Sequence, residues 1–299
     1  SFLGTLGERG ATIPVVGAAY DVGIELAGPG VTARMFVNAT SEISSSANVF
    51  AETPEGAVDN VVVVGAHLDS VTSGPGIQDN GSGSAAILEV ALQMANVKPR
   101  NKVRFAWWGG HENGLEGSTE YVSQLTPEEI DNIALYLDFD MLASPNFVYF
   151  VLDGDDSDDV GFGPGPEGSG PIEAFFEDYY AGLGLPFKGT DLSGRSDYAP
   201  FSALGIPVGG LFTGAEGVKT PEEVAFWGGT AGDQYDPCYH LACDTFDNVS
   251  LEALDVNSDA VAAATLQYAM STEEVNGERG KGNFKLKRSR VGVGPPVSE

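Results

Sequence analysis

The stretch VVVVGAHLDS, residues 61 to 70, opens with four consecutive valines and then carries a histidine and an aspartate, His67 and Asp69. An unbroken run of β-branched residues is typical of a strand that is buried on both of its faces. Strands of that kind occur in parallel sheets that helices cover on both sides. The stretch therefore predicts a core strand of an α/β domain, with polar side chains at its carboxyl end.

Strand-like and helix-like segments alternate along the chain around this stretch. The pattern of apolar residues predicts further core strands over residues 102–110, 132–141, 146–154 and 205–214. It predicts helices over residues 82–97, 114–125, 171–184 and 250–270. This alternation favours one sheet that is mostly parallel. Weaker signals predict a strand, turn and short helix over 11–26, strands over 31–40 and 45–56, and a loop over 155–170.

The composition argues against two classes of partner. The chain has 299 residues and a formal net charge of -28, and six of its fifteen basic residues lie between residues 279 and 290. A body this acidic repels nucleic acid and anionic membrane surfaces. No run of about 18 or more apolar residues is present, so the sequence predicts no transmembrane helix.

The ends of the predicted strands carry one kind of polar residue. Functional side chains of open α/β sheets gather at the carboxyl ends of the strands. The residues found near those ends are imidazoles and carboxylates: His67, Asp69, Asp79, His111, Glu112, Asp138 and Asp140, with His240 far downstream. Converging carboxylates repel one another unless cations lie between them. Imidazole together with carboxylate is a ligand set that suits zinc, including pairs of ions bridged by one carboxylate.

Each of these residues also has a purely structural explanation. A single aspartate at a strand end is more often a cap, and a single histidine is more often a hydrogen-bonded core residue. The joint pattern is what favours a metal site, because all three histidines follow apolar or cysteine-flanked segments with acids nearby. The two cysteines, Cys238 and Cys243, could close a small disulfide loop or remain free thiols.

Several longer motifs resemble a known family. GAHLDSV, GIQDNGSGSAAILE, RFAWWGGHENGLEGS, YLDFDM, GRSDYAPF, IPVGGLFTGA and WGGTAGDQYDPCYHLACD are similar to motifs of the secreted bacterial double-zinc aminopeptidases of metallopeptidase family 28. The resemblance covers roughly residues 45 to 270. It implies a phosphorylase/hydrolase-like fold, in which helices cover both faces of a mixed, mostly parallel sheet.

The same resemblance implies the ligands of two zinc ions per chain. His67 and Asp140 would bind one ion, Glu112 and His240 would bind the other, and Asp79 would bridge the two. Asp69, two residues after His67, would orient the His67 imidazole.

The resemblance also implies roles for two residues that face the substrate. Tyr239 would stabilise the oxyanion of the tetrahedral intermediate, although a tyrosine at this position could equally be a core residue. Arg195 would help to hold the substrate, or it could form a salt bridge with Asp197 or Asp191.

One position departs from the family pattern. Family members typically carry two adjacent glutamates in this motif, of which the first is the general base and the second is a zinc ligand. Glu112 matches the ligand, but His111 stands at the position of the base. An imidazole would begin neutral and end as a cation beside two metal ions, so we expect slower turnover than in a typical member.

The two ends of the chain lie outside the resemblance to the zinc core. Residues 4 to 26 resemble the last part of a protease-associated domain, which some family members carry before the core. We therefore predict three segments. They are a remnant of that domain with a linker over 1–40, a zinc peptidase domain over 41–271, and a poorly ordered basic tail over 272–299.

Three functions are compatible with these motifs. The first is a zinc exopeptidase that removes amino-terminal, apolar residues from peptides or proteins. Cys238 and Cys243 match the family's disulfide, so this enzyme would be secreted, and we expect it to be monomeric. The second is a metal-retaining binding or regulatory protein with little turnover, which His111 favours. The third is a single-zinc acyl-transfer relative such as a glutaminyl cyclase, which the five-ligand set argues against.

Overall fold

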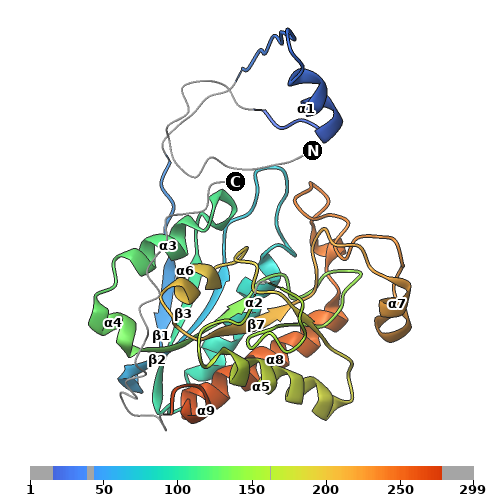
Figure 1. Ribbon diagram of the computed structural model, residues 1–299. Coiled ribbons are helices and arrows are strands. Elements are labelled where there is room, and N and C mark those ends of the chain that lie inside the picture. The colour runs from blue at the N-terminus through green and yellow to red at the C-terminus, as the bar shows by residue number, and fades with distance from the viewer. Residues whose placement is uncertain (1–15, 39–43, 162, 278–299) are drawn as a thin grey trace. The chain divides into compact units, whose positions relative to one another are not determined.

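The computed structural model describes residues 16–38, 44–161 and 163–277 (Figure 1). Contacts between residues divide the chain into two compact units, Ser1–Ser46 and Ala47–Glu299. The assignment of residues 1–40 to a protease-associated domain stays a prediction. All the candidate site residues lie in the second unit.

The first unit contains a short helix, α1 Tyr20–Leu26, at the end of the segment where a strand, turn and helix were expected. Residues 16–19 form no strand, and residues 11–15 are outside the described part. The strand predicted over residues 31–40 is wrong for residues 31–38, which form neither strand nor helix; residues 39–40 are outside the described part. An alternating pattern forms a strand only where a second strand supplies hydrogen bonds and a core covers one face. The side chains of residues 31–38 are instead exposed, and Phe36 reaches 87%.

The described residues of the second unit form one seven-stranded sheet in the order β1-β3-β2-β4-β7-β5-β6. Its strands are β1 Val49–Glu52, β2 Ala57–His67, β3 Asn101–Trp108, β4 Ile133–Phe139, β5 Phe150–Leu152, β6 Lys188–Thr190 and β7 Val208–Phe212. Strands β2, β3, β4 and β7 are parallel, whereas β1 and β5 are antiparallel to their neighbours β3 and β7. The sheet is therefore mixed, with a parallel centre.

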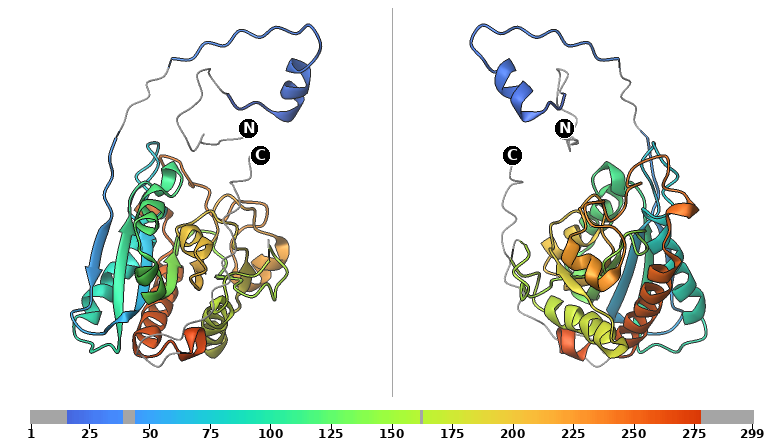
Figure 2. Two further views of the ribbon diagram at one scale, coloured as in Figure 1. Left: turned by 60° about the vertical axis from the view of Figure 1, so that its left-hand side comes forward. Right: turned by 90° about the vertical axis from the view of Figure 1, so that its right-hand side faces the viewer.

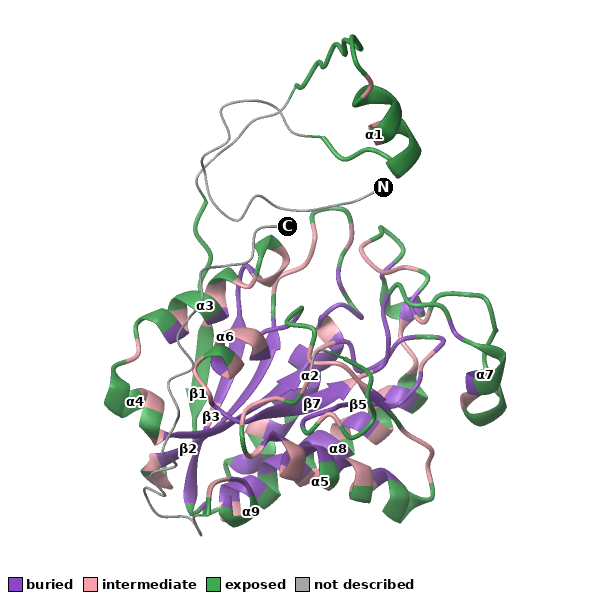
Figure 3. Ribbon diagram, viewed as in Figure 1, coloured by how far each residue is buried: buried purple, intermediate pink, exposed green. Residues whose placement is uncertain are grey.

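Helices cover both faces of this sheet (Figure 2). Val62 and Val64 of β2 pack in a core with α2 Gly81–Met94, α5 Ser169–Leu183 and α8 Leu251–Met270. Val61 and Val63 point to the opposite face, where the core includes residues of α3 Glu116–Ser123 and α6 Tyr198–Ala203. Buried residues accordingly occupy the central strands and the inner helix surfaces, whereas the edge strand β1 is exposed (Figure 3). This confirms the predicted three-layer α/β fold.

Short elements differ more from expectation than long ones. The strand predicted over 146–154 is limited to Phe150–Leu152, and the three-residue strand β6 was not predicted. The helices α4 Pro127–Asn132 and α7 Pro221–Trp227 were also missed, although each begins with a Thr-x-x-Glu capping box. The predicted tail begins with a further helix, α9 Glu273–Asn276, and residues 278–299 are outside the described part.

The parallel centre of the sheet brings the candidate residues to one edge. Strand β2 lies between β3 and β4, and its last residue, His67, pairs in register with Trp108 at the end of β3. Asp140 directly follows β4, and Asp79 directly precedes Asn80, the N-cap of α2. None of the described helices is long and apolar enough to cross a bilayer.

Candidate metal centre

Five residues expected to bind metal converge at the carboxyl end of the sheet. His67 ends β2, Asp140 follows β4, and Glu112 lies in the 3-10 turn His111–Asn113 that follows β3. Asp79 reaches the cluster from the loop before α2, where the Asn80 side chain accepts the N–H of Gly83.

The five side chains form two groups that share Asp79. His67 Nε2 lies 3.1 Å from Asp79 Oδ1 and 3.1 Å from Asp140 Oδ1. His240 Nε2 lies 3.1 Å from Asp79 Oδ2 and 3.1 Å from Glu112 Oε2. The ligand atoms of one tetrahedral zinc ion lie about 3.3 Å apart when the bonds are near 2.0 Å. Each group therefore has the spacing of ligands on a single ion, with one oxygen of Asp79 in each group.

A buried oxygen without a partner supports metal binding at this centre. Glu112 Oε1 is buried and has no hydrogen-bond partner among the described residues. Burial of a carboxylate oxygen without a partner costs several kcal/mol of folding free energy unless a cation or a water molecule binds to it. The donor set also matches zinc, because it combines imidazole nitrogens with carboxylate oxygens.

The imidazoles and carboxylates of the centre also shift one another's pKa values. Hydrogen bonds with Asp79 and Glu112 raise the pKa of His240 to about 10. Burial lowers the pKa of His67, but Asp140 and Asp79 outweigh this effect and leave the pKa raised. A metal ion that binds here must therefore displace protons from both rings.

The carboxylate of Asp69 was expected to orient the His67 ring, but the main contacts of Asp69 are different. Its main-chain oxygen lies 3.0 Å from His67 Nδ1, whereas its carboxylate Oδ1 lies 3.9 Å from that nitrogen. The carboxylate instead accepts the backbone N–H groups of His111 and Glu112 at 3.0 and 3.1 Å. Asp69 therefore orients the His67 ring with its backbone and holds the turn that carries Glu112 with its side chain.

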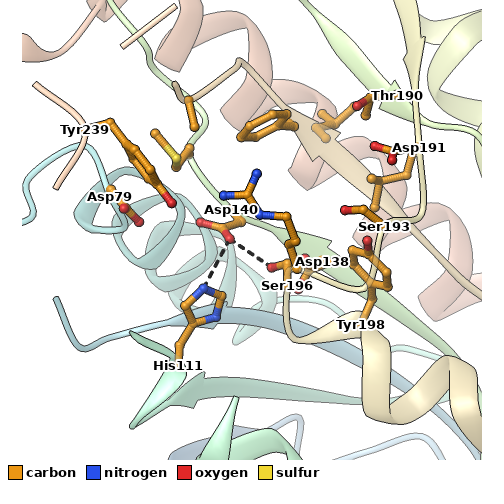
Figure 4. A pocket seen from close by; sticks show the side chains of 16 residues that line it. Asp79, His111, Asp138, Asp140, Thr190, Asp191, Ser193, Ser196, Tyr198 and Tyr239 are labelled. Carbon is orange, nitrogen blue, oxygen red and sulfur yellow. Dashed lines mark hydrogen bonds and ion pairs between the residues drawn. The ribbon is translucent and has the colours of Figure 1, made fainter. Parts of the chain in front are cut away.

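His111 points into the same centre (Figure 4). Its ring stacks on the ring of His67, and its Nε2 lies 3.8 Å from Asp140 Oδ2. Its Nδ1 lies 2.8 Å from Oδ2 of Asp197, a residue that is 1% exposed. Burial and the charge of His67 lower the pKa of His111, but Asp197 and Asp140 outweigh them and raise it.

Tyr239 and His240 lie on a loop that a disulfide closes. Cys238 and Cys243 are bonded, with their Cα atoms 5.3 Å apart. His240 has a φ of 59°, in the left-handed region that few non-glycine residues adopt. The Tyr239 ring stacks on the His240 ring and lines the cavity beside Asp79 (Figure 4). Tyr239 is thus a residue of the site and not of the core.

Arg195 forms an ion pair with Glu216, which the sequence analysis did not propose as a partner. Its Nη1 lies 2.8 Å from Glu216 Oε1, and its side chain is 64% exposed. Asp197 is occupied by His111 and by Ser118, whose hydroxyl donates to its Oδ1. The alternative salt bridges from Arg195 to Asp197 or Asp191 do not form, and Arg195 lines the cavity.

A cavity of about 140 Å³ opens beside the five-residue cluster. Asp79, Asp140 and His111 line one side of it (Figure 4). Its other walls are mixed: Met141, Leu152, Leu211, Phe212 and Ala215 supply an apolar part, and the polar part includes Asp138, Thr190, Asp191, Ser193 and Ser196. The cavity can therefore hold an apolar side chain while a polar group of the same molecule reaches the cluster.

Residues 48–265 match the model of peptidase family M28. The chain belongs to peptidase family M28. An aminopeptidase of Pseudomonas aeruginosa is 52% identical over 268 residues, which cover 89% of this chain and 49% of that protein. A leucine aminopeptidase 2 of Trichophyton rubrum is 45% identical over 276 residues, which cover 91% and 55%. The chain thus spans about half the length of these M28 relatives.

Solved structures of aminopeptidases share the fold. A zinc aminopeptidase from Bacillus subtilis aligns with a TM-score of 0.60 at 26% identity, covering 74% of this chain and 49% of that one. An aminopeptidase from Aneurinibacillus aligns with a TM-score of 0.58 at 28% identity, covering 74% and 47%.

Sequence reasoning missed two residues that support the M28 site. Asp197 was considered only as a partner of Arg195, yet it contacts His111. Asp244 accepts the backbone N–H of Gln78 and Asp79, at 2.9 and 3.1 Å, and so holds the loop that presents the shared ligand. The position of Asp244 directly after Cys243 was a usable signal, whereas no spacing in the sequence links Asp197 to His111.

Proposed function

We propose that this chain is the catalytic core of a zinc aminopeptidase that holds two zinc ions and removes amino-terminal apolar residues from peptides. The observation that carries the proposal is the shared carboxylate of Asp79. Each of its oxygens lies 3.1 Å from a different imidazole, of His67 or of His240. That geometry is expected of a carboxylate between two ions and is unnecessary for one ion.

The five ligands would hold the ions as the family resemblance implies: His67 and Asp140 on one, Glu112 and His240 on the other, and Asp79 on both. When bound, the ions would supply Lewis acidity toward the peptide carbonyl and make a nearby water more acidic. The chain's own residues then bind the substrate, donate a hydrogen bond to the developing oxyanion, and accept and return one proton.

Tyr239 is the proposed hydrogen-bond donor to the oxyanion. Burial raises the pKa of its phenol, and the charge of Asp79 raises it further, so the hydroxyl keeps its proton at neutral pH. A neutral phenol in a low-dielectric site is a strong donor to negative charge that develops during the reaction. Arg195, at the cavity rim beside Tyr239, is the proposed contact for the remainder of the substrate.

The apolar part of the cavity wall supports a preference for apolar amino-terminal residues. Met141, Leu152, Leu211 and Phe212 would surround the side chain of the first residue. Burial of such a side chain contributes about 1.5–3 kcal/mol. The disulfide between Cys238 and Cys243 supports a secreted protein, because such bonds persist in oxidising compartments.

Turnover of amino-acid p-nitroanilides by the zinc-loaded chain tests this function. We expect leucine and phenylalanine anilides to be cleaved, N-acetyl-leucine anilide to be resistant, and activity to disappear with a chelator and return with zinc. The alternative that His111 favours is a metal-binding protein with little turnover. Full zinc loading with no release of nitroaniline from any member of the panel would support that alternative.

A further inference from the structure

His111 does not stand alone at the position where the family carries a glutamate. Asp197, in the segment GRSDYAPF directly before α6, contacts its Nδ1 at 2.8 Å. The other oxygen of this buried carboxylate accepts the hydroxyl of Ser118, which belongs to α3. Two helices on one face of the sheet thus hold a carboxylate against the ring.

The contact determines which nitrogen of His111 carries a lone pair. An ionised carboxylate only accepts hydrogen bonds, so Nδ1 must be the donor to Asp197. In the neutral ring, the lone pair is then on Nε2. Nε2 is the nitrogen that faces the metal centre, 3.8 Å from Asp140 Oδ2.

The stack with His67 argues against His111 as a further ligand on the same ion. The two ring centroids lie 3.7 Å apart and the planes differ by 7°. An imidazole binds a metal along the lone pair in its own ring plane. Two parallel planes separated by that distance cannot both contain one ion. His67 Nε2 already faces Asp79 and Asp140, so the lone pair of His111 is directed to the space beside that ligand set.

We propose that Asp197 is a positioning residue that, together with Ser118, orients His111 so that its Nε2 accepts a proton from the attacking water. This proposal rests on the aminopeptidase function proposed above. The water oxygen bonds to the peptide carbonyl carbon while one water proton moves to Nε2. The bond from that carbon to the peptide nitrogen then breaks, and the proton on Nε2 moves to the leaving nitrogen.

The slower turnover expected from the sequence assumed an isolated imidazole. His111 is not isolated, because the buried carboxylate of Asp197 lies 2.8 Å from its Nδ1.

A double-mutant cycle on the zinc-loaded chain tests whether Asp197 acts through His111. We expect His111→Ala to lower kcat by roughly 10²–10⁴-fold and Asp197→Ala by roughly 10–100-fold, with KM and zinc content little changed. In the His111→Ala background, Asp197→Ala should cost nothing further. Glu173→Ala is the matched control, because it removes another buried carboxylate and should leave kcat unchanged.

A second readout does not depend on activity. The chain has three histidines, so nitrogen NMR of the zinc-loaded protein can resolve each ring, with His111 assigned by the signal that His111→Ala removes. We expect the Nδ1–H form for His111, and its loss in Asp197→Ala. If Asp197→Ala does not fold, Ser118→Ala and the isosteric Asp197→Asn test the same coupling with smaller expected effects.

The outcomes separate this proposal from the proposed function. A fully zinc-loaded wild type without turnover overturns the function, and the NMR result still tests the role of Asp197. The positioning role is overturned if the decreases in kcat of the two single variants multiply in the double variant. It is also overturned if the His111 tautomer is unchanged in Asp197→Ala. A zinc-loaded His111→Glu variant that is at least tenfold faster than wild type overturns it as well, since the imidazole would then be the defect.

Discussion

The phenol ring of Tyr239 lies against the imidazole of His240, with ring centroids 3.8 Å apart and planes 23° apart. The two residues are adjacent in sequence, and the backbone of His240 adopts a left-handed conformation where the rings stack. The loop is also held by Asp236, whose Oδ1 accepts the backbone N–H of Cys238 at 2.9 Å. One disulfide-closed segment therefore presents both the proposed hydrogen-bond donor and the proposed metal ligand.

Tyr239→Phe should lower kcat for leucine p-nitroanilide by roughly 10²–10³-fold, because it removes one proposed donor to the oxyanion. Steady-state kinetics with zinc measured on the same samples would check this. Tyr235→Phe is the control, because that phenol donates to Glu223 at 2.8 Å and does not line the cavity. A Tyr239→Phe enzyme with wild-type kcat would exclude the oxyanion role.

Substitutions of two ligands should remove different numbers of ions. His67→Ala takes one ligand from a single group, so zinc content should fall to about one ion per chain. Asp79→Ala takes a ligand from both groups and should leave less than one. Elemental analysis after zinc supplementation measures both. His111→Ala is the control, and zinc loss in that variant equal to the loss in His67→Ala would identify His111 as a ligand.

Replacement of Cys238 and Cys243 by serine should reduce the free energy of unfolding by only about 2 kcal/mol, because the closed loop is short. Chemical denaturation monitored by fluorescence would measure the change. We expect a larger relative effect on kcat, since the loop carries Tyr239 and His240. Reductant should reproduce the loss of activity in wild type and have no effect on the double-serine variant. Equal sensitivity of both proteins to reductant would contradict this role.

Glu173 should make the protein less stable at alkaline pH. Burial raises its pKa to about 7, and the charges of Asp153 and Asp155 add to this although the N–H of Gly154 opposes it. The unfolded value is about 4.3. The folded state therefore favours protonated Glu173, and this stabilisation is present below about pH 4 and lost as pH rises through 7.

Glu173→Gln should consequently stabilise the protein by up to about 3 kcal/mol at pH 8 and by little at pH 4. The amide oxygen can still accept the N–H groups of Gly154 and Asp155, which now reach Glu173 Oε2 at 2.8 and 3.2 Å. Denaturation at several pH values checks the trend, with the exposed Asp178→Asn as control. A difference in unfolding free energy between Glu173→Gln and wild type that does not change with pH would contradict this prediction.

The long elements could be predicted because their own residues specify them. Four consecutive valines at residues 61–64 place apolar side chains on both faces of a strand, so both faces must be buried. These residues form the buried centre of β2. His67 ends β2, Glu112 and Asp140 follow β3 and β4, and parallel strands necessarily end at one edge. Residues 31–38 show the opposite case, in which an alternating pattern has no partner strand.

By itself, the sequence determined the α/β class and the imidazoles and carboxylates at the strand ends, because these follow from local composition and from spacing along the chain. The division of the ligands between two ions and the unusual imidazole at residue 111 came from the resemblance to a known family. Only the tertiary structure decided what those residues touch. His111 and Asp197 are 86 positions apart in sequence, and Arg195 and Glu216 are 21 apart. Such contacts depend on the order of the strands and on how α3 and α6 pack on them, which is set by burial across the whole sheet and not by any single segment.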